Sequence, residues 1–331
     1  MCMWFCLRAD DPAQSFRNSN LFFGVLHSVL VLICLSVLFS RLPLVPYYTL
    51  TVLRVQAIKV YPVALACIVN GIAAFIHFIW SLFANSIVHN SIHHYRVNHA
   101  RWLYHSICDG LCLTLILVLL KADSFDTLLL TFLLWSCIMC LNYFQDSYVS
   151  RNQFDPKCAP HTFAFPFYVI LMVFIVLYSA QNLHEENIFQ LIVSGVALLF
   201  TLQIFFIQKT QMVYLLRLRR DSSRIDHSEF DVDENDHESH TEVELSEMNS
   251  HANTDTRFIG IDSEKESMTS NLEDTALRLA SQIESMRAAV RFEVYFYCAS
   301  FVSHLLVSLL TLDKVVLLSE RFVHDHPPNP Y

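Results

Sequence analysis

The chain has 331 residues, of which 54% are hydrophobic and 16% are charged, whereas average soluble domains have roughly 45–50% apolar and about 25% charged residues. This composition excludes a soluble globular protein and predicts a polytopic membrane protein embedded in a lipid bilayer. The net charge of −9 excludes a basic surface for nucleic acid. The 5 glycines form no G-x-G-x-x-G loop of the kind that cradles phosphates.

Seven segments reach or approach the length of about 20 apolar residues that a transmembrane helix needs. They lie at 21–40, 60–83, 102–120, 127–144, 163–180, 188–208 and 292–312. The first follows a polar stretch that carries Asp10, Asp11 and Arg17, so we interpret it as a span and not as a cleaved signal. The sequence therefore predicts an all-α, multi-pass bundle of seven transmembrane helices.

Basic residues near the ends of the spans predict the orientation, because lysine and arginine in short loops stay on the cytoplasmic side. With the N-terminus inside, the inner segments hold Arg8, Arg17, Arg96, Arg101, Arg151, Lys157, Lys209, Arg217, Arg219, Arg220, Arg287 and Arg291. The outer segments hold Arg41, Arg54, Lys59, Lys121, Lys314 and Arg321. The bias favours a cytoplasmic N-terminus and an extracellular or lumenal C-terminus. The sequence contains no retention or sorting motif that would identify the membrane.

Composition divides the chain into six parts, which are a cytoplasmic N-terminus (1–20), six spans with short loops (21–220), an acidic insert (221–269), an amphipathic helix (270–291), the seventh span (292–313) and an outer tail (314–331). The insert is rich in acidic residues, serine and histidine, and we expect it to be disordered. Ser270 and Glu273 form a capping box that predicts where the amphipathic helix begins. Residues 221–291 are the candidate site for a cytoplasmic partner, and serines in the insert are candidates for phosphorylation.

Part of the acidic insert matches the template of a calcium-binding loop. Asp231, Asp233, Asn235 and Glu242 stand at its positions 1, 3, 5 and 12. Asp236, however, occupies the position where the sharp turn requires glycine, and no periodic helix precedes the segment. We therefore favour a solvated acidic linker over a calcium site.

Five ionisable residues lie at membrane depth, where they are costly and are functional candidates by default. They are His27, His77, His105, Asp109 and His304. His105 and Asp109 are i,i+4 neighbours, and Ser106 can share their helix face. The pair could hold a proton or an internal ion pair. Asp109 could equally be a neutral acid hydrogen-bonded to Ser106, and the lone histidines could be hydrogen-bonded packing residues.

Several span segments resemble those of one known family. The first span has Gly24-Val25 followed by His27, the second has Ala-Phe-Ile-His-Phe-Ile at 74–79, and the third opens with Arg101-Trp102 ahead of Ser106. The fourth ends with Tyr-Phe-Gln-Asp-Ser-Tyr at 143–148, and the fifth has Pro-Phe-Tyr at 166–168. In order and spacing these segments resemble the heliorhodopsins, across all seven spans but not in the acidic insert.

This resemblance implies a rhodopsin-like bundle, a homodimer and a cytoplasmic N-terminus, the last in agreement with the charge bias. Heliorhodopsins hold retinal on a lysine of the seventh span, in the pattern S-x-V-x-K, with a glutamate of the third-span pattern R-W-x-E-Y-S as its counterion. The segment matching the first pattern is Ser300 to His304, so His304 replaces the lysine. Tyr104 replaces the glutamate, and His105 replaces the tyrosine that follows it.

The two replacements are consistent with each other. A buried counterion is tolerable only beside a buried cation, so loss of the Schiff base favours a neutral residue such as Tyr104. An imidazole has no primary amine and cannot form a stable imine. Lys314, ten residues beyond His304, lies about 15 Å further along a helix. We therefore expect no covalent retinal, whereas non-covalent retinal or another apolar ligand in the polar interior remains open. That interior comprises His27, His77, Tyr104, His105, Asp109, Ser300 and His304.

Three functions are compatible with these residues. The first is a retinal-independent signalling or ligand-binding membrane protein with the acidic segment as its output. The second is a proton or ion pathway through the interior histidines and Asp109. The third is a photoreceptor that binds retinal in an unusual way. An enzyme is not expected, because no zinc triad, no nucleophile with an adjacent base and no paired carboxylates occur at matched depth.

Overall fold

The computed structural model describes residues 11–40, 47–52, 55–93, 98–150, 160–181, 188–189, 191–214 and 259–325. Within these residues, seven helices are long and apolar enough to cross a membrane. The predicted all-α bundle of seven helices is thereby confirmed, and the chain is a multi-pass integral membrane protein.

The first five spans follow one another along the chain. They are α2 (Pro12–Ser40), α3 (Pro62–Leu82), a third span from Arg101 to Leu119, α7 (Phe125–Ser150) and α8 (Pro160–Gln181). The sixth is the helix Leu191–Tyr214, and the seventh lies in α10 (Ile259–Asp325). After α3 the chain continues through the short α4 (Ala84–Ile87) and the π-helical η2 (Val88–His93).

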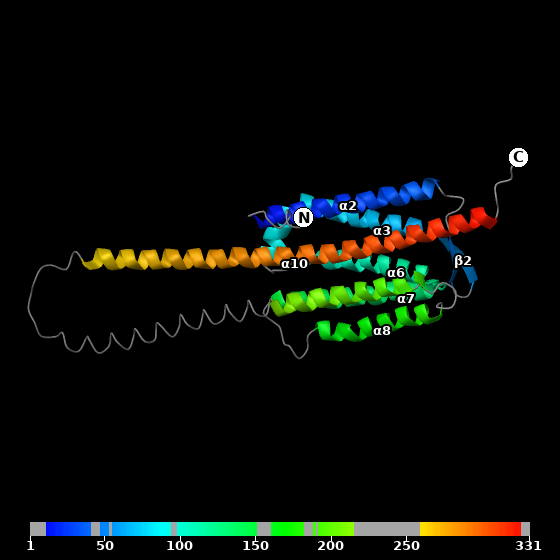
Figure 1. Cartoon of the computed structure of the whole chain (residues 1–331). Coiled ribbons are helices and arrows are strands. Elements are labelled where there is room, and N and C mark those ends of the chain that lie inside the picture. The colour runs from blue at the N-terminus through cyan, green and yellow to red at the C-terminus, as the bar shows by residue number, and fades with distance from the viewer. Residues whose placement is uncertain are drawn as a thin grey trace, which may run out of the picture. The chain divides into compact units, whose positions relative to one another are not determined.

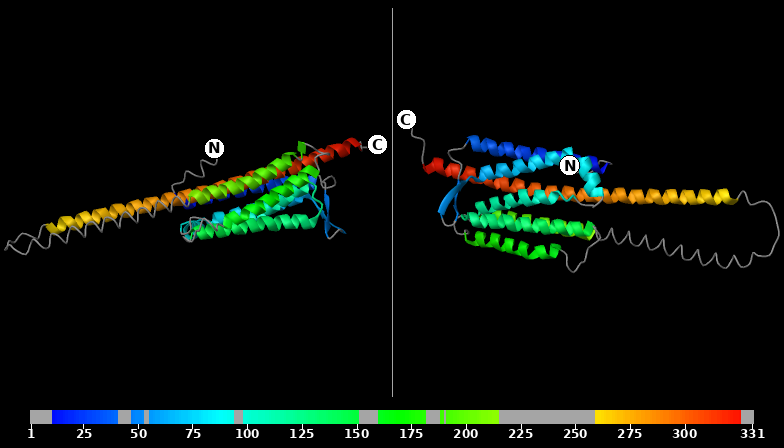
Figure 2. Two further views of the ribbon diagram at one scale, coloured as in Figure 1. Left: turned by 90° about the horizontal axis from the view of Figure 1, so that it is seen from below. Right: turned by 180° about the vertical axis from the view of Figure 1, so that it is seen from behind.

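The chain divides into two compact units, which are residues 1–211 with 289–331, and residues 212–288. The first unit is the bundle. Figures 1 and 2 show α2, α3, α6 (Gly110–Leu119), α7, α8 and the C-terminal part of α10 running side by side in it. The second unit is helical from residue 259 onward.

The third span is the central helix of the bundle. Of its most apolar 18-residue stretch 72% is buried, compared with 22% for α8. It consists of α5 (Arg101–Tyr104), η3 (His105–Asp109) and α6 (Gly110–Leu119), and η3 is π-helical. A π-helical turn changes which residues share a face, and such turns are frequent at functional sites.

Several helix ends differ from the prediction. Helix α2 begins at Pro12 and not at 21, because the Asp11 side chain accepts a hydrogen bond from the Ala13 amide at 2.9 Å and proline suits the first helical position. Helix α10 begins at Ile259, inside the predicted disordered insert, and passes Ser270 without a break, so Ser270 caps no helix. It continues to Asp325, through most of the predicted tail. The stretch 259–325 contains no proline, and Pro327 is the next one.

A β-hairpin stands where an outer loop was expected. Strands β1 (Tyr48–Val52) and β2 (Val55–Val60) pair antiparallel, with a register shift after Leu50. Leu50 is buried against the bundle, and the Thr51 amide donates to the Asp123 carbonyl at 2.7 Å. The hairpin therefore packs over the end of the bundle where the third span meets α7.

Candidate functional site

Asp109 is the centre of a buried polar cluster between the third span and α10. Its Oδ2 lies 2.6 Å from His105 Nδ1, and its Oδ1 accepts a hydrogen bond from Ser300 Oγ at 2.5 Å. His304 Nε2 is 3.1 Å from the same Oδ1. All four side chains are almost completely buried. The predicted contact between His105 and Asp109 is thus present, and α10 adds a serine and a second imidazole.

Two hydroxyl groups, those of Tyr104 and Ser300, form a chain of hydrogen bonds to Asp109. Tyr104 Oη lies 3.2 Å from Ser300 Oγ. Because Ser300 donates its proton to Asp109, its oxygen is the acceptor for Tyr104. In the alternative left open by the sequence, Ser106 would bond Asp109, but Ser300 takes that place and Ser106 is only half-buried. The π-helical turn His105–Asp109 explains this, because it breaks the α-helical spacing that would align Ser106 with Asp109.

Two further histidines lie beside the cluster, each oriented by an asparagine. His27 Nδ1 is 2.9 Å from Asn70 Oδ1, and His77 Nδ1 is 2.9 Å from Asn20 Oδ1. Both asparagine amides donate elsewhere, so the oxygens accept and each Nδ1 is the donor. Asn70 also donates to Ser308 at 2.9 Å, which extends the polar contacts along α10.

Aromatic rings fill the space among these groups. The His27 and His77 rings are stacked with centroids 5.6 Å apart, and the His304 ring lies 5.4 Å from His27. Phe301 lies edge-on to His27 at 5.1 Å, and Tyr104 is 5.1 Å from His77. These separations are those of rings in direct contact. The structure thus brings together every predicted interior residue except Ser106.

A second buried network, not predicted as a site, surrounds Arg101 at the start of the third span. Its Nη1 donates to Glu293, and its Nη2 donates to Asp146 and Gln211, each at 2.6 Å. Trp102 Nε1 also donates to Asp146 Oδ2, at 2.7 Å. The network joins the third span, α7, the helix Leu191–Tyr214 and α10.

The Arg101 network contains two carboxyl groups and one guanidinium group. One guanidinium serves the two carboxylates of Asp146 and Glu293, and all three groups are buried. The guanidinium also lies over the Trp102 ring at 4.6 Å and the Phe296 ring at 4.3 Å. One signal in the sequence was available, since Glu293 stands inside the predicted seventh span, where an acid requires a partner.

Contacts between the two networks are made by rings. The Tyr297 hydroxyl donates to Glu293 at 3.2 Å, while its ring lies 5.0 Å from that of His77 and 6.3 Å from that of Tyr104. Tyr297 therefore belongs to the Arg101 network by its hydroxyl and packs on the Asp109 cluster by its ring.

The remaining sequence observations concern metal binding and the acidic insert. Among the residues that the structure describes, no three histidine, cysteine, aspartate or glutamate side chains are arranged to hold a metal ion. The calcium-loop match at 231–242 and the acidic insert up to residue 258 lie outside the described residues.

Comparison of the chain with protein-family models and with curated proteins finds no match in either. The chemistry of the site therefore has to be taken from its own residues. A buried carboxylate in contact with two imidazoles and a serine can hold a proton in several arrangements, and such a cluster is suited to an internal ion pair or to proton exchange.

Proposed function

We propose that this chain is a heliorhodopsin-like membrane protein that works without covalently bound retinal, as a retinal-independent signalling or ligand-binding protein. One observation carries the proposal. The residue at the position that the resemblance assigns to the retinal lysine is His304, and its Nε2 is 3.1 Å from Asp109 Oδ1. An imidazole therefore faces the Asp109 carboxylate at the position where the resemblance places the Schiff base.

The chemistry of the neighbouring residues supports this proposal. Tyr104, at the counterion position, offers a neutral hydroxyl that bonds Ser300 and not a second carboxylate. A second buried acid beside Asp109 would lack a matching cation and would be costly. The exchange of glutamate for tyrosine and of lysine for histidine therefore leaves Asp109 with partners from the protein alone.

Packing beside His304 also weighs against non-covalent retinal at this position. The rings of His27 and Phe301 are in mutual contact, and His304 contacts His27. A polyene would have to displace these rings, with the hydrogen bond from His27 to Asn70. We therefore favour signalling over retinal binding.

The output of such a protein would lie in the segment 221–291. Its part up to residue 258 lies outside the described residues, whereas 270–291 belongs to α10. The same helix carries Glu293, Ser300 and His304. A partner that binds 270–291 would thus act on the helix that supplies half of the buried polar cluster.

A proton pathway is the second candidate, and one observation favours it. Polar contacts run from Tyr104 through Ser300 to Asp109, and others run from His27 through Asn70 to Ser308. A pathway must also cross the buried apolar end of the third span, where Leu115 to Leu120 are all buried. An acid-evoked current that Asp109→Asn abolishes would favour this function over the first.

A photoreceptor with a different retinal lysine has less support. Lys314 is ten residues beyond His304, which is about 15 Å along a helix. Its ammonium lies 4.9 Å from the Phe189 ring, at the other end of the span from Glu293.

The test is the absorption spectrum of the purified protein expressed with all-trans retinal. We expect the parent to be colourless. A His304→Lys variant, alone or with Tyr104→Glu, tests the packing beside residue 304. A visible band would mean that space for retinal persists and that only the Schiff base was lost, whereas a colourless variant would mean that the rings of His27 and Phe301 close that space. A visible band in the parent that resists hydroxylamine and is fixed by borohydride would contradict the proposal.

A further inference from the structure

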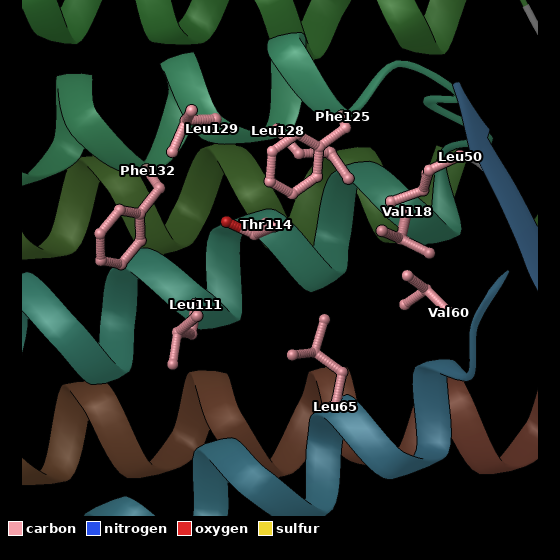
Figure 3. A pocket seen from close by; sticks show the side chains of 10 residues that line it. All are labelled: Leu50, Val60, Leu65, Leu111, Thr114, Val118, Phe125, Leu128, Leu129 and Phe132. Carbon is pink, nitrogen blue, oxygen red and sulfur yellow. The ribbon is translucent and has the colours of Figure 1, made fainter. Parts of the chain in front are cut away.

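A cavity of about 280 Å³ lies between α3, α6, α7 and the β-hairpin. Figure 3 shows its walls, with Leu65 from α3 facing Leu111 and Thr114 from α6, and Phe125 and Phe132 from α7. None of these residues belongs to the Asp109 cluster or to the Arg101 network. The cavity is therefore separate from the candidate site, and its occupant is independent of the proposed function.

The walls exclude water as the occupant. Thr114 supplies the single polar side chain of the lining, and its hydroxyl already donates to the Gly110 carbonyl at 2.9 Å. A buried water needs two to four polar partners, and apolar cavities stay dry. The volume is roughly twice that of an engineered apolar cavity of about 150 Å³ that binds benzene. An apolar molecule is thus the occupant that fits.

The cavity is accessible from the side of the bundle. Leu129, in its wall, is 44% exposed, and the neighbouring Leu130 and Leu133 are 51% and 50% exposed. These residues lie within a transmembrane helix, so the surface they form faces lipid hydrocarbon. A ligand can therefore enter from the bilayer without passing through water.

The shape favours a flexible chain. The wall on α6 extends from Leu111 to Val118, which is about 10 Å along the helix. At one end Leu50 and Val60 of the hairpin close the cavity. A space of this length, closed by the hairpin at one end and lined by apolar side chains, fits an extended hydrocarbon segment.

We propose that the cavity binds one acyl chain of a membrane lipid, which enters between α3 and α7 and lies over α6 among Leu65, Leu111 and Phe132. The occupied site fills the groove between three spans. It also supports the hairpin through Leu50, which is only 2% exposed.

The experiment uses the full chain in vesicles of phosphatidylcholine that carries a diazirine near the end of one acyl chain. After irradiation, peptide mass spectrometry locates the labelled residues. We expect labelling at Leu111 and Thr114, in addition to the labelling by bulk lipid at the outward residues Leu130 and Leu133. Labelling of the outward residues without any at Leu111 and Thr114 would overturn the proposal.

Two variants that fill the cavity provide the controls, Thr114→Phe from α6 and Leu65→Phe from α3. Either one, provided that its thermal unfolding matches the parent's, should lose the label at Leu111. Leu130→Phe, which adds the same kind of ring on the lipid-facing side, should keep it.

Two other occupants would overturn the proposal with distinct results. Labelling of the lining only by a diazirine-bearing sterol would assign the cavity to a rigid ring system. If the lining residues are labelled in monomers but not in dimers, the cavity is covered by a second copy of this chain.

Discussion

Ser300 is the residue on which the polar cluster depends most, because its hydroxyl joins Tyr104 to Asp109. Ser300→Ala leaves a buried carboxylate without one donor and a buried phenol without its acceptor. We expect a loss of about 1–3 kcal/mol in the free energy of unfolding, measured by thermal unfolding in lipid nanodiscs. Ser106→Ala is the matched control and should change it by less than about 0.5 kcal/mol. Equal effects of the two changes would contradict the assigned role of Ser300.

At the residue scale, the sequence predicted which side chains would be costly but not how they would meet. His105 and Asp109 could be paired because i,i+4 spacing is local. The partners Ser300 and His304 come from α10, and such contacts depend on tertiary packing. Arg101, Asp146 and Glu293 were missed because each stands at or near the end of a span as predicted from the sequence, where a charge can also be solvated.

At the element scale, the Arg101 network holds four helices together with unequal charges. Arg101→Gln leaves two buried carboxylates without a cation, so we expect a loss of about 3–5 kcal/mol in the free energy of unfolding. Glu293→Gln leaves the pair of Arg101 with Asp146 intact and should cost about 1 kcal/mol, the usual net value of a hydrogen bond. Thermal unfolding of both variants in the same lipid checks this difference. Equal losses would mean that the network requires both carboxylates as anions.

Helices whose sequence signals are local were predicted, whereas structure that depends on contacts between distant residues was not. Hydropathy and length identified all seven spans, since a membrane permits few alternatives to a helix. Helix ends depended on caps, such as Asp11 before Pro12, that hydropathy does not detect. The hairpin Tyr48–Val60 and the π-helical turn His105–Asp109 were missed, because strand pairing and packing decide them.

At the scale of the whole molecule, the orientation in the membrane is the prediction with the widest consequences. Helix α3 runs from the hairpin, at Pro62, to α4 and η2, so exposed Lys59 and exposed His89 lie at opposite ends of the bundle. The loop charges predict that the hairpin end is outside. The Arg101 network, which comes after η2 in the chain, would then lie toward the cytoplasm.

Thiol labelling in sealed membrane vesicles of known orientation tests this topology. Cys2, Cys6 and Cys158 are first changed to serine, because the predicted topology places all three on the cytoplasmic side. In that background Lys59→Cys should react with a membrane-impermeant maleimide from the outer side, and His89→Cys should react only after permeabilisation. The parent that carries only the serine substitutions corrects for the remaining thiols, of which Cys137 and Cys140 are exposed within a span and face lipid.

The reverse labelling pattern would place the Arg101 network toward the outside and the residues 221–291 with it. In that case neither the charge bias nor the resemblance to heliorhodopsins would describe this protein, and a cytoplasmic partner at 221–291 would be excluded.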